Sequence, residues 1–282
     1  MTRVRIVHVT GYRYPMGATA SVNEVRMTPA NTPYQRVQSS VIEINPSAWQ
    51  QRYTDYWGTS VTSFEVHELH ERLSVVATSV VDVNRANDPR DPQLDWNTMR
   101  SDATAGDHLE MLGQTDWVEP SEELAAIASA IAADAPTPRD AAHRVIAAVR
   151  DRVKYVPGFT FVNTRADEAW DAGAGVCQDM VHCAIGALRS IGIPARYVSG
   201  YVLPASEPAV NSPQTGESHA WLQFWDGRWV GWDPTNDTAP GDHHVEVGVG
   251  REYRDVSPLR GIYSGAGTSD MYVEVKMTVL EA

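Results

Sequence analysis

The sequence contains only two cysteines, Cys177 and Cys183, among 282 residues. They lie six positions apart on one predicted helix, which argues against a disulfide framework, and this spacing does not match the usual zinc ligand pairs. The first eight residues also lack the apolar stretch and cleavage site of a secretory signal. We therefore expect a cytoplasmic protein with reduced thiols, without a metal or other cofactor.

Positive charge and long apolar runs are also scarce. The 23 Lys and Arg residues against 36 Asp and Glu residues give a formal net charge of -13, which argues against binding to nucleic acid or to an anionic membrane surface. No apolar run is long enough to span a bilayer. Hydrophobic residues make up 43% of the chain, as is ordinary for a globular protein. The composition gives no indication of the oligomeric state.

The hydrophobic pattern divides the chain into three parts. Residues 1–87 contain segments rich in β-branched residues and segments that alternate apolar with polar, as in 4–10 and 39–44, which predicts a small antiparallel β domain. Residues 88–118 begin with a polar stretch that contains two prolines and are interpreted as a linker. Residues 119–282 open with helices and continue with strands, which predicts an α+β domain.

Three helix starts can be placed from capping signals in this last part. Ser121 precedes two glutamates, Thr137 precedes Pro138 at the first helical position, and a third helix begins at Cys177 and ends before Gly192. The segment after the following strand, residues 204–217, contains three prolines and predicts a long loop. We expect this loop to gate access to a site.

Cys177 has the surroundings of a reactive thiol. Gly173 and Gly175 lead into the helix that begins at Cys177, and unpaired N–H groups in a first helical turn favour a thiolate. The same N–H groups can hold a developing oxyanion. The alternative is an inert buried cysteine, which is a common fate of this residue type and the one we expect for Cys183.

A histidine and an aspartate occur on a predicted β-hairpin downstream. The strand-like runs 218–225 and 228–233 are joined at Asp226-Gly227, and Asp-Gly is a strong hairpin signal. The hairpin carries His219 near its start and Asp233 at its end. Taken singly, these two residues could equally be a surface histidine and a turn aspartate before a proline.

Two loop lengths compete in this hairpin. A two-residue loop would place His219 and Asp233 on opposite faces, and the carboxylate would then lie unpaired among apolar side chains. A three-residue loop with Gly227 left-handed would oppose Phe224 to Arg228, and therefore His219 to Asp233. The pattern of side chains favours the second register, in which the carboxylate can orient the imidazole ring.

These residues lie within longer motifs, and further segments extend the pattern toward the C-terminus. The segments are Gly175-Val176-Cys177-Gln178-Asp179, residues 192–201, Ser218-His219-Ala220-Trp221, Asp233-Pro234-Thr235-Asn236, residues 249–256 and Arg260-Gly261. Together they resemble the bacterial transglutaminase-like family, and the N-terminal strands are similar to the β-rich region that accompanies this core in bacteria. The sequence departs from the family at Gly58-Thr59, where a Gly-Asn turn is frequent.

The resemblance implies a papain-like α+β core, with helices packed on an antiparallel sheet, preceded by the small antiparallel β domain. It implies that Cys177 is the nucleophile, His219 the base and Asp233 the orienting carboxylate. The expected activity is acyl transfer from peptide or glutamine side-chain amides of a protein or peptide substrate through a thioester, with hydrolysis slightly favoured over cross-linking. The alternative from another class is a non-catalytic binding module that retains the fold.

Overall fold

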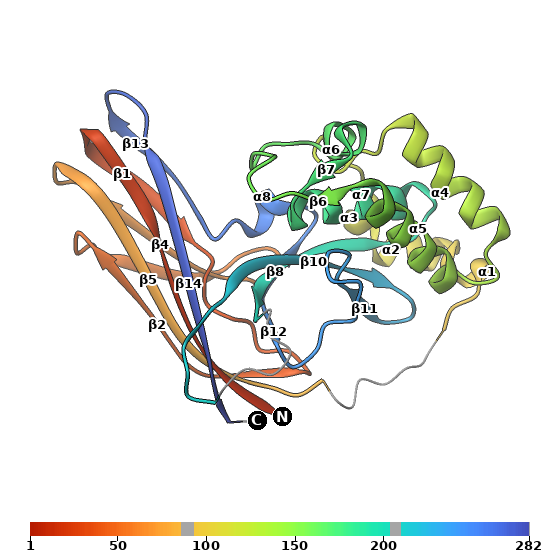
Figure 1. Ribbon diagram of the computed structural model, residues 1–282, viewed down its shortest axis with the longest axis horizontal. Helices are drawn as coiled ribbons and strands as arrows, with labels where there is room; N and C mark the ends of the chain where they lie inside the picture. The colour runs from red at the N-terminus through yellow and green to blue at the C-terminus, as the bar shows by residue number, and fades with distance from the viewer. Residues whose placement is uncertain (86–92, 204–209, 282) are drawn as a thin grey trace.

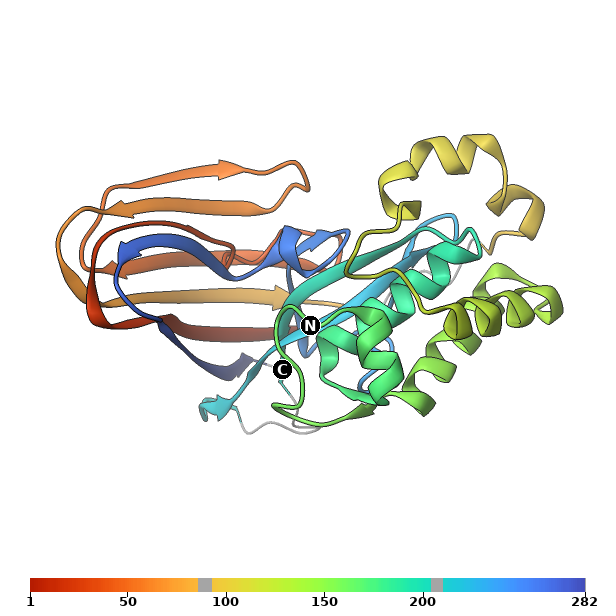
Figure 2. The same ribbon diagram turned by 90° about the horizontal axis from the view of Figure 1, so that it is seen from above.

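The computed structural model describes residues 1–85, 93–203 and 210–281. Two antiparallel sheets meet at the end of the molecule where both termini lie, and they diverge toward the opposite end (Figure 1). The helices gather beside the second sheet, at the end away from the first sheet (Figure 2). This arrangement confirms the predicted α+β class.

The first sheet is built around one long strand, β1 (Thr2–Val25), in which buried and more exposed residues alternate along most of its length. Its eight strands are antiparallel. The others are β2 (Gln35–Asn45), β3 (Gln50–Thr54), β4 (Ser60–Val66), β5 (His70–Val83), β9 (Gln214–Thr215), β13 (Leu259–Gly265) and β14 (Asp270–Glu281).

The second sheet has the strand order β11-β10-β8-β12 and is also antiparallel. Its strands are β8 (Ala195–Val202), β10 (Glu217–Trp225), β11 (Trp229–Trp232) and β12 (His244–Gly250). A separate parallel pair, β6 (Lys154–Tyr155) and β7 (Ala174–Gly175), leads into the central helix.

The helices surround α7, which contacts α4, α5, α6 and β10. The eight helices of the described residues are α1 (Trp96–Met99), α2 (Asp102–Asp107), α3 (Leu109–Leu112), α4 (Glu122–Asp134), α5 (Pro138–Arg152), α6 (Ala166–Ala172), α7 (Cys177–Ser190) and α8 (Tyr253–Val256). The predicted helix starts are confirmed, since the side chains of Ser121 and Thr137 cap α4 and α5.

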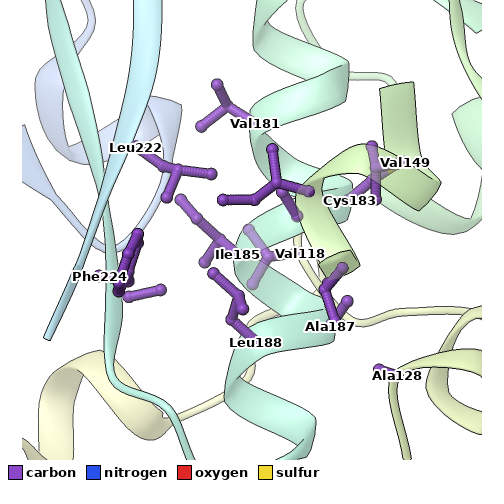
Figure 3. Close-up of a cluster of buried hydrophobic side chains, with 14 of the residues drawn as sticks. Val118, Ala128, Val149, Val181, Cys183, Ile185, Ala187, Leu188, Leu222 and Phe224 are labelled. Carbon is purple, nitrogen blue, oxygen red and sulfur yellow. The ribbon is translucent and has the colours of Figure 1, made fainter. Parts of the chain in front are cut away.

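The core of the second unit lies between α7 and β10. Ile185 and Leu188 of α7 and Leu222 and Phe224 of β10 are buried together (Figure 3). Gly186 lies on α7 where another chain segment passes so closely that an added Cβ would be 1.6 Å from the carbonyl oxygen of Val118. Burial on this scale fixes α7, and therefore its first residue, relative to the strands beside it.

A second apolar core joins the two sheets. It contains side chains of β1 and β14 from the first sheet and of β8 and β12 from the second, among them Val4, Ile6, Tyr201, Val245, Val275 and Met277. This core holds the first sheet against the second, so that strands β1 and β14 have a defined position relative to β8 and β12.

The predicted division at residues 87 and 119 stays a prediction, and strand pairing adds two facts to it. Strands β13 and β14 return to the first sheet and pair with β1, although they belong to the last part of the chain. The segment interpreted as a linker contains α1, α2 and α3, and Met99 is buried in the core around α7. Residues 86–92 of that segment lie outside the described residues.

Candidate active site

Cys177 is the first residue of α7 and is partly buried. The turn into the helix is held by Asp179, whose Oδ2 accepts a hydrogen bond from the backbone N–H of Val176 at 2.7 Å. Gly175 is required there, because an added Cβ would lie 2.7 Å from the Cβ of Asp179. The first N–H groups of a helix have no partner inside it, which favours negative charge on a group at the position of Cys177.

Cys183 is the second thiol of α7, and it is fully buried. Its Sγ donates a hydrogen bond to the carbonyl oxygen of Ala166 at 3.2 Å. Burial raises the pKa of the Cys183 thiol well above its ordinary value. This environment favours an inert thiol, in agreement with the expectation for Cys183.

His219 lies on β10 and binds a carboxylate. Its Nε2 is 2.7 Å from Oδ2 of Asp233, and the Cys177 side chain is close enough to the ring to affect its pKa. Burial alone would lower the pKa of His219, but the hydrogen bonds and charges of Asp233 and Cys177 outweigh it and raise this pKa to about 10. The ring therefore favours the imidazolium form over the neutral pH range.

Asp233 is fully buried and surrounded by donors. Its Oδ1 accepts the backbone N–H groups of Thr235 at 3.0 Å and Asn236 at 3.2 Å. Its Oδ2 accepts from the side chains of His219 and Asn236, both at 2.7 Å. Burial would raise the pKa of Asp233, but the donors from His219, His244 and Asn236 hold it well below its usual range.

His244 of β12 is a further neighbour of this carboxylate that the sequence did not single out. Its Nδ1 accepts the backbone N–H of Gly241 at 3.1 Å, so its Nε2 carries the ring proton and donates it to Oδ2 of Asp233 at 3.2 Å. Burial lowers the pKa of His244, against the opposing effect of Asp233, which keeps the ring neutral.

The ligand-type atoms of His219, Asp233 and His244 all lie within 4.8 Å of one another. Their hydrogen bonds fit a proton-ordered network better than a metal site. The Nε2 of His244 cannot offer a lone pair while its Nδ1 accepts from a backbone N–H, because a neutral imidazole has one donor and one acceptor nitrogen. The arrangement fixes the carboxylate rather than supplying an open set of ligands.

The hairpin that carries His219 and Asp233 has neither of the two registers considered from the sequence. The structure opposes Trp225 to Trp229, with Asp226, Gly227 and Arg228 in the loop and Gly227 left-handed at φ 77°. Tertiary contacts hold this loop in place, since the Asp226 carboxylate accepts the backbone N–H of Leu94 at 2.7 Å and pairs with Arg139.

The face assignment made from the sequence nevertheless holds, because the observed register differs from the favoured one by two residues. Leu222, Phe224, Val230 and Trp232 share the face that packs in the core around α7. Pairing between β10 and β11 ends at Leu222 and Trp232, and Asp233 then forms a bridge with Thr238. His219 and Asp233 therefore meet diagonally rather than as an opposed pair.

Cys177 and His219 line a pocket of about 330 Å³ between the two sheets. Tyr197 of β8 and Tyr253 of α8 belong to its wall, and so do residues of the first sheet, His8, Met271 and Val273. The pocket is mainly apolar around the Cys177 thiol and the His219 ring, as expected of a site that binds an organic substrate.

Comparison with known proteins agrees with the fold. Residues 4–82 match the bacterial transglutaminase-like N-terminal region, and residues 125–234 match the core of the transglutaminase-like superfamily. An uncharacterized protein of Mycobacterium leprae is 41% identical over 280 residues, which cover 99% of this chain and 100% of that protein. An uncharacterized protein of Mycobacterium tuberculosis is 33% identical over 99% of this chain and 93% of its own length. The chain therefore belongs to the transglutaminase-like superfamily.

One solved structure shares the whole fold. The "Putative Cysteine Protease" of Cytophaga hutchinsonii has a TM-score of 0.79 and 19% identity, over 100% of this chain and 91% of that one. A protein-glutamine gamma-glutamyltransferase of Pseudomonas aeruginosa is 35% identical over 87 residues, which is 29% of this chain and 13% of that protein. Among the described residues, none of the helices has the length and hydropathy needed to cross a membrane.

Proposed function

We propose that this protein is a cysteine-dependent acyl-transfer enzyme that acts on amides of protein or peptide substrates, with Cys177 as nucleophile, His219 as base and acid, and Asp233 as the orienting carboxylate. The observation that carries the proposal is the hydrogen bond between the buried Asp233 carboxylate and the His219 ring, in a pocket that His219 and Cys177 line together. Membership of the transglutaminase-like superfamily supports it.

The geometry suits a thiolate–imidazolium mechanism. The Cys177 sulfur attacks the amide carbonyl carbon, and the first N–H groups of α7 hold the oxyanion that forms on the carbonyl oxygen. The C–N bond then breaks, and the proton held on Nδ1 of His219 passes to the leaving nitrogen, which departs as an amine. The product on the enzyme is a thioester, and His219 is left neutral with Nδ1 free to accept a proton.

A second nucleophile completes the reaction. Water, deprotonated by His219, releases a carboxylate, whereas an amine substrate forms a new amide. We favour hydrolysis slightly over cross-linking, and the name of the C. hutchinsonii structure as a cysteine protease supports this choice. The partial likeness to a gamma-glutamyltransferase is the observation on the side of cross-linking.

Mass spectrometry of a reduced bacterial proteome, incubated with wild type or with Cys177→Ala, tests the proposal. Hydrolysis predicts new peptide termini or glutamines converted to glutamate, and cross-linking predicts isopeptide pairs, in each case only with wild type. If wild type and Cys177→Ala leave the proteome equally unmodified but both bind the same peptides, the non-catalytic binding module is favoured instead. We also propose a cytoplasmic location, which cell fractionation would check.

A further inference from the structure

The outer edge of β14 has hydrogen-bonding groups that are partly used by the chain itself. In an antiparallel strand the N–H and C=O of one residue point to one side and those of the next residue to the other. The outward carbonyl of Val279 accepts the backbone N–H of Asn211 at 2.7 Å, and that of Val275 accepts the N–H of Gly216 at 3.1 Å. Residues 211–216 thus cover this edge, with β9 paired to Lys276 and Met277.

The chain leaves the edge at Gly216 and crosses to β10, the strand that carries His219. By the same alternation, the next outward groups on β14 are the N–H and C=O of Val273 and then of Met271. Within the residues that the structure describes, no strand pairs with this part of the outer edge. The point where residues 216–218 diverge from β14 forms a fork. A pocket of about 400 Å³ lies at this fork, with Gly216 and Ser218 on one side and Val273 to Lys276 on the other.

This free edge leads to the nucleophile. Val273 and Ser218 line both the pocket at the fork and the pocket that contains Cys177 and His219. The side chains of Val275 and Met277 are buried in the core between the sheets, whereas those of Met271 and Val273, on the same face, are 46% and 50% exposed. The apolar face of β14 therefore continues from the buried core into the pocket that contains Cys177 and His219.

The first sheet also contributes one buried polar side chain to the pocket that contains Cys177 and His219. His8 of β1 lines the pocket, is 1% exposed and donates or accepts only through Nδ1, which is 3.0 Å from the hydroxyl of Tyr201. Its Nε2 has no hydrogen-bond partner in the described part of the chain. A buried polar atom without a partner is costly unless a ligand or water meets it.

We propose that the substrate is an extended, unfolded polypeptide segment that adds to the edge of β14 as a further strand at Met271–Val273, where residues 211–216 leave it uncovered. The inference rests on the proposed function and names its substrate class. Main-chain hydrogen bonds to Val273 would supply sequence-independent affinity, as in other cases of strand addition. Apolar substrate side chains would lie against Met271 and Val273, and the acyl-donor amide would reach Cys177.

The substitution Val273→Pro removes the outward N–H without touching the inward pairing to β1, which uses the alternate residues. Val273→Ala is the matched control, because it shortens the side chain and keeps the N–H. The two probes are denatured, fluorescently labelled casein and p-nitrophenyl acetate, a small ester that can acylate Cys177 without using the edge. Melting temperatures report whether each variant is folded.

We expect kcat/KM for casein to be at least 10-fold lower in Val273→Pro than in Val273→Ala, whereas the ester rates of these two variants should agree within about 2-fold. Equal loss in the proline and alanine variants, or casein turnover unchanged by proline, would overturn the inference, and so would a wild type that reacts with the ester but ignores casein. Ester reaction no faster than in Cys177→Ala would instead refute the proposed function.

A second measurement uses only wild-type protein and therefore does not depend on how the proline variant folds. A casein peptide that is cleaved or modified by the enzyme is resynthesised with one N-methyl group at each position in turn. Strand addition predicts that turnover falls when the methylated amide is one of every second amide on one side of the reacting residue, because only alternate N–H groups bond to β14. Loss at no position, or equal loss at consecutive positions, would contradict docking on a strand edge.

Discussion

Asp233→Asn should inactivate the enzyme by reversing the tautomer of His219. Within the described part of the chain, every hydrogen-bond partner of this carboxylate is a donor: two backbone N–H groups on Oδ1 and the side chains of His219, Asn236 and His244 on Oδ2. An asparagine oxygen can replace Oδ1, but its NH₂ group then faces Nε2 of His219. The ring can accept this N–H only by carrying its own proton on Nδ1, which is the nitrogen that must accept the thiol proton.

The size of the effect follows from the His219 pKa. A rise from 6.5 to about 10 corresponds to about 5 kcal/mol in favour of the charged ring, shared between Asp233 and Cys177. Without the Asp233 charge, only Cys177 still opposes the effect of burial, and the pKa of His219 should fall below its wild-type value of about 10. The same exchange in a serine protease triad costs roughly 10⁴-fold in rate, and we expect about 10³- to 10⁴-fold here.

Stability should change with a characteristic pH dependence. The raised His219 pKa stabilises the fold fully below about 6.5, and this contribution is lost as the pH rises through about 10. The lowered Asp233 pKa contributes above about 3.8 and is lost as the pH falls through its native value. Wild type should therefore exceed Asp233→Asn by about 3 kcal/mol between about pH 5 and 6.5, and the difference should shrink as the pH rises from there toward 10 or falls below about 3.8.

Two measurements check this reasoning. ¹⁵N NMR of the His219 ring gives its pKa and tautomer in both proteins, and urea unfolding from pH 4 to 10.5 gives the stability difference. Asn236→Ala serves as the control, since it removes one donor to Oδ2 and leaves the charge. An unchanged His219 pKa in Asp233→Asn, or a stability difference that does not vary with pH, would refute the argument.

Three further outcomes are expected. Iodoacetamide at about pH 6 should alkylate Cys177 and leave buried Cys183 unmodified, and His219→Ala should abolish that selectivity; equal labelling of both thiols would contradict it. His244→Phe should reduce kcat roughly 10-fold and shift the pH profile, with His244→Gln restoring both, whereas a purely structural role would leave the profile unmoved. Gly186→Ala should lower the free energy of unfolding by about 3 kcal/mol in a urea titration, and a smaller change than 1 kcal/mol would show that the contact relaxes.

Local signals in the sequence were sufficient for the helix starts and for the sheet faces. A capping side chain and a proline act within one helical turn, so Ser121 and Thr137 could be placed without knowing their neighbours. The division of the β10–β11 hairpin into two faces also depends on alternation alone. Both kinds of prediction were confirmed because each depends on interactions within one element.

The hairpin register could not be predicted in this way. Asp226 lies in the turn as predicted, but its carboxylate also binds Leu94 and Arg139, which are distant in the chain and could not be read from the local pattern. In the structure Arg228 joins the loop, and the pairing extends to Trp225 and Trp229. His244 escaped notice for the same reason, since its role depends on the approach of β12 to Asp233 and not on its sequence neighbours.

The return of β14 to the first sheet has the largest consequence for function. The proposed nucleophile and ring belong to the second unit, but Val273 and His8 of the first sheet form part of the same pocket. Without β1 and β14 the second unit would lose the pocket wall that carries His8, Met271 and Val273. Because the core between the sheets fixes that wall, the first sheet determines the shape of the pocket beside Cys177 and His219.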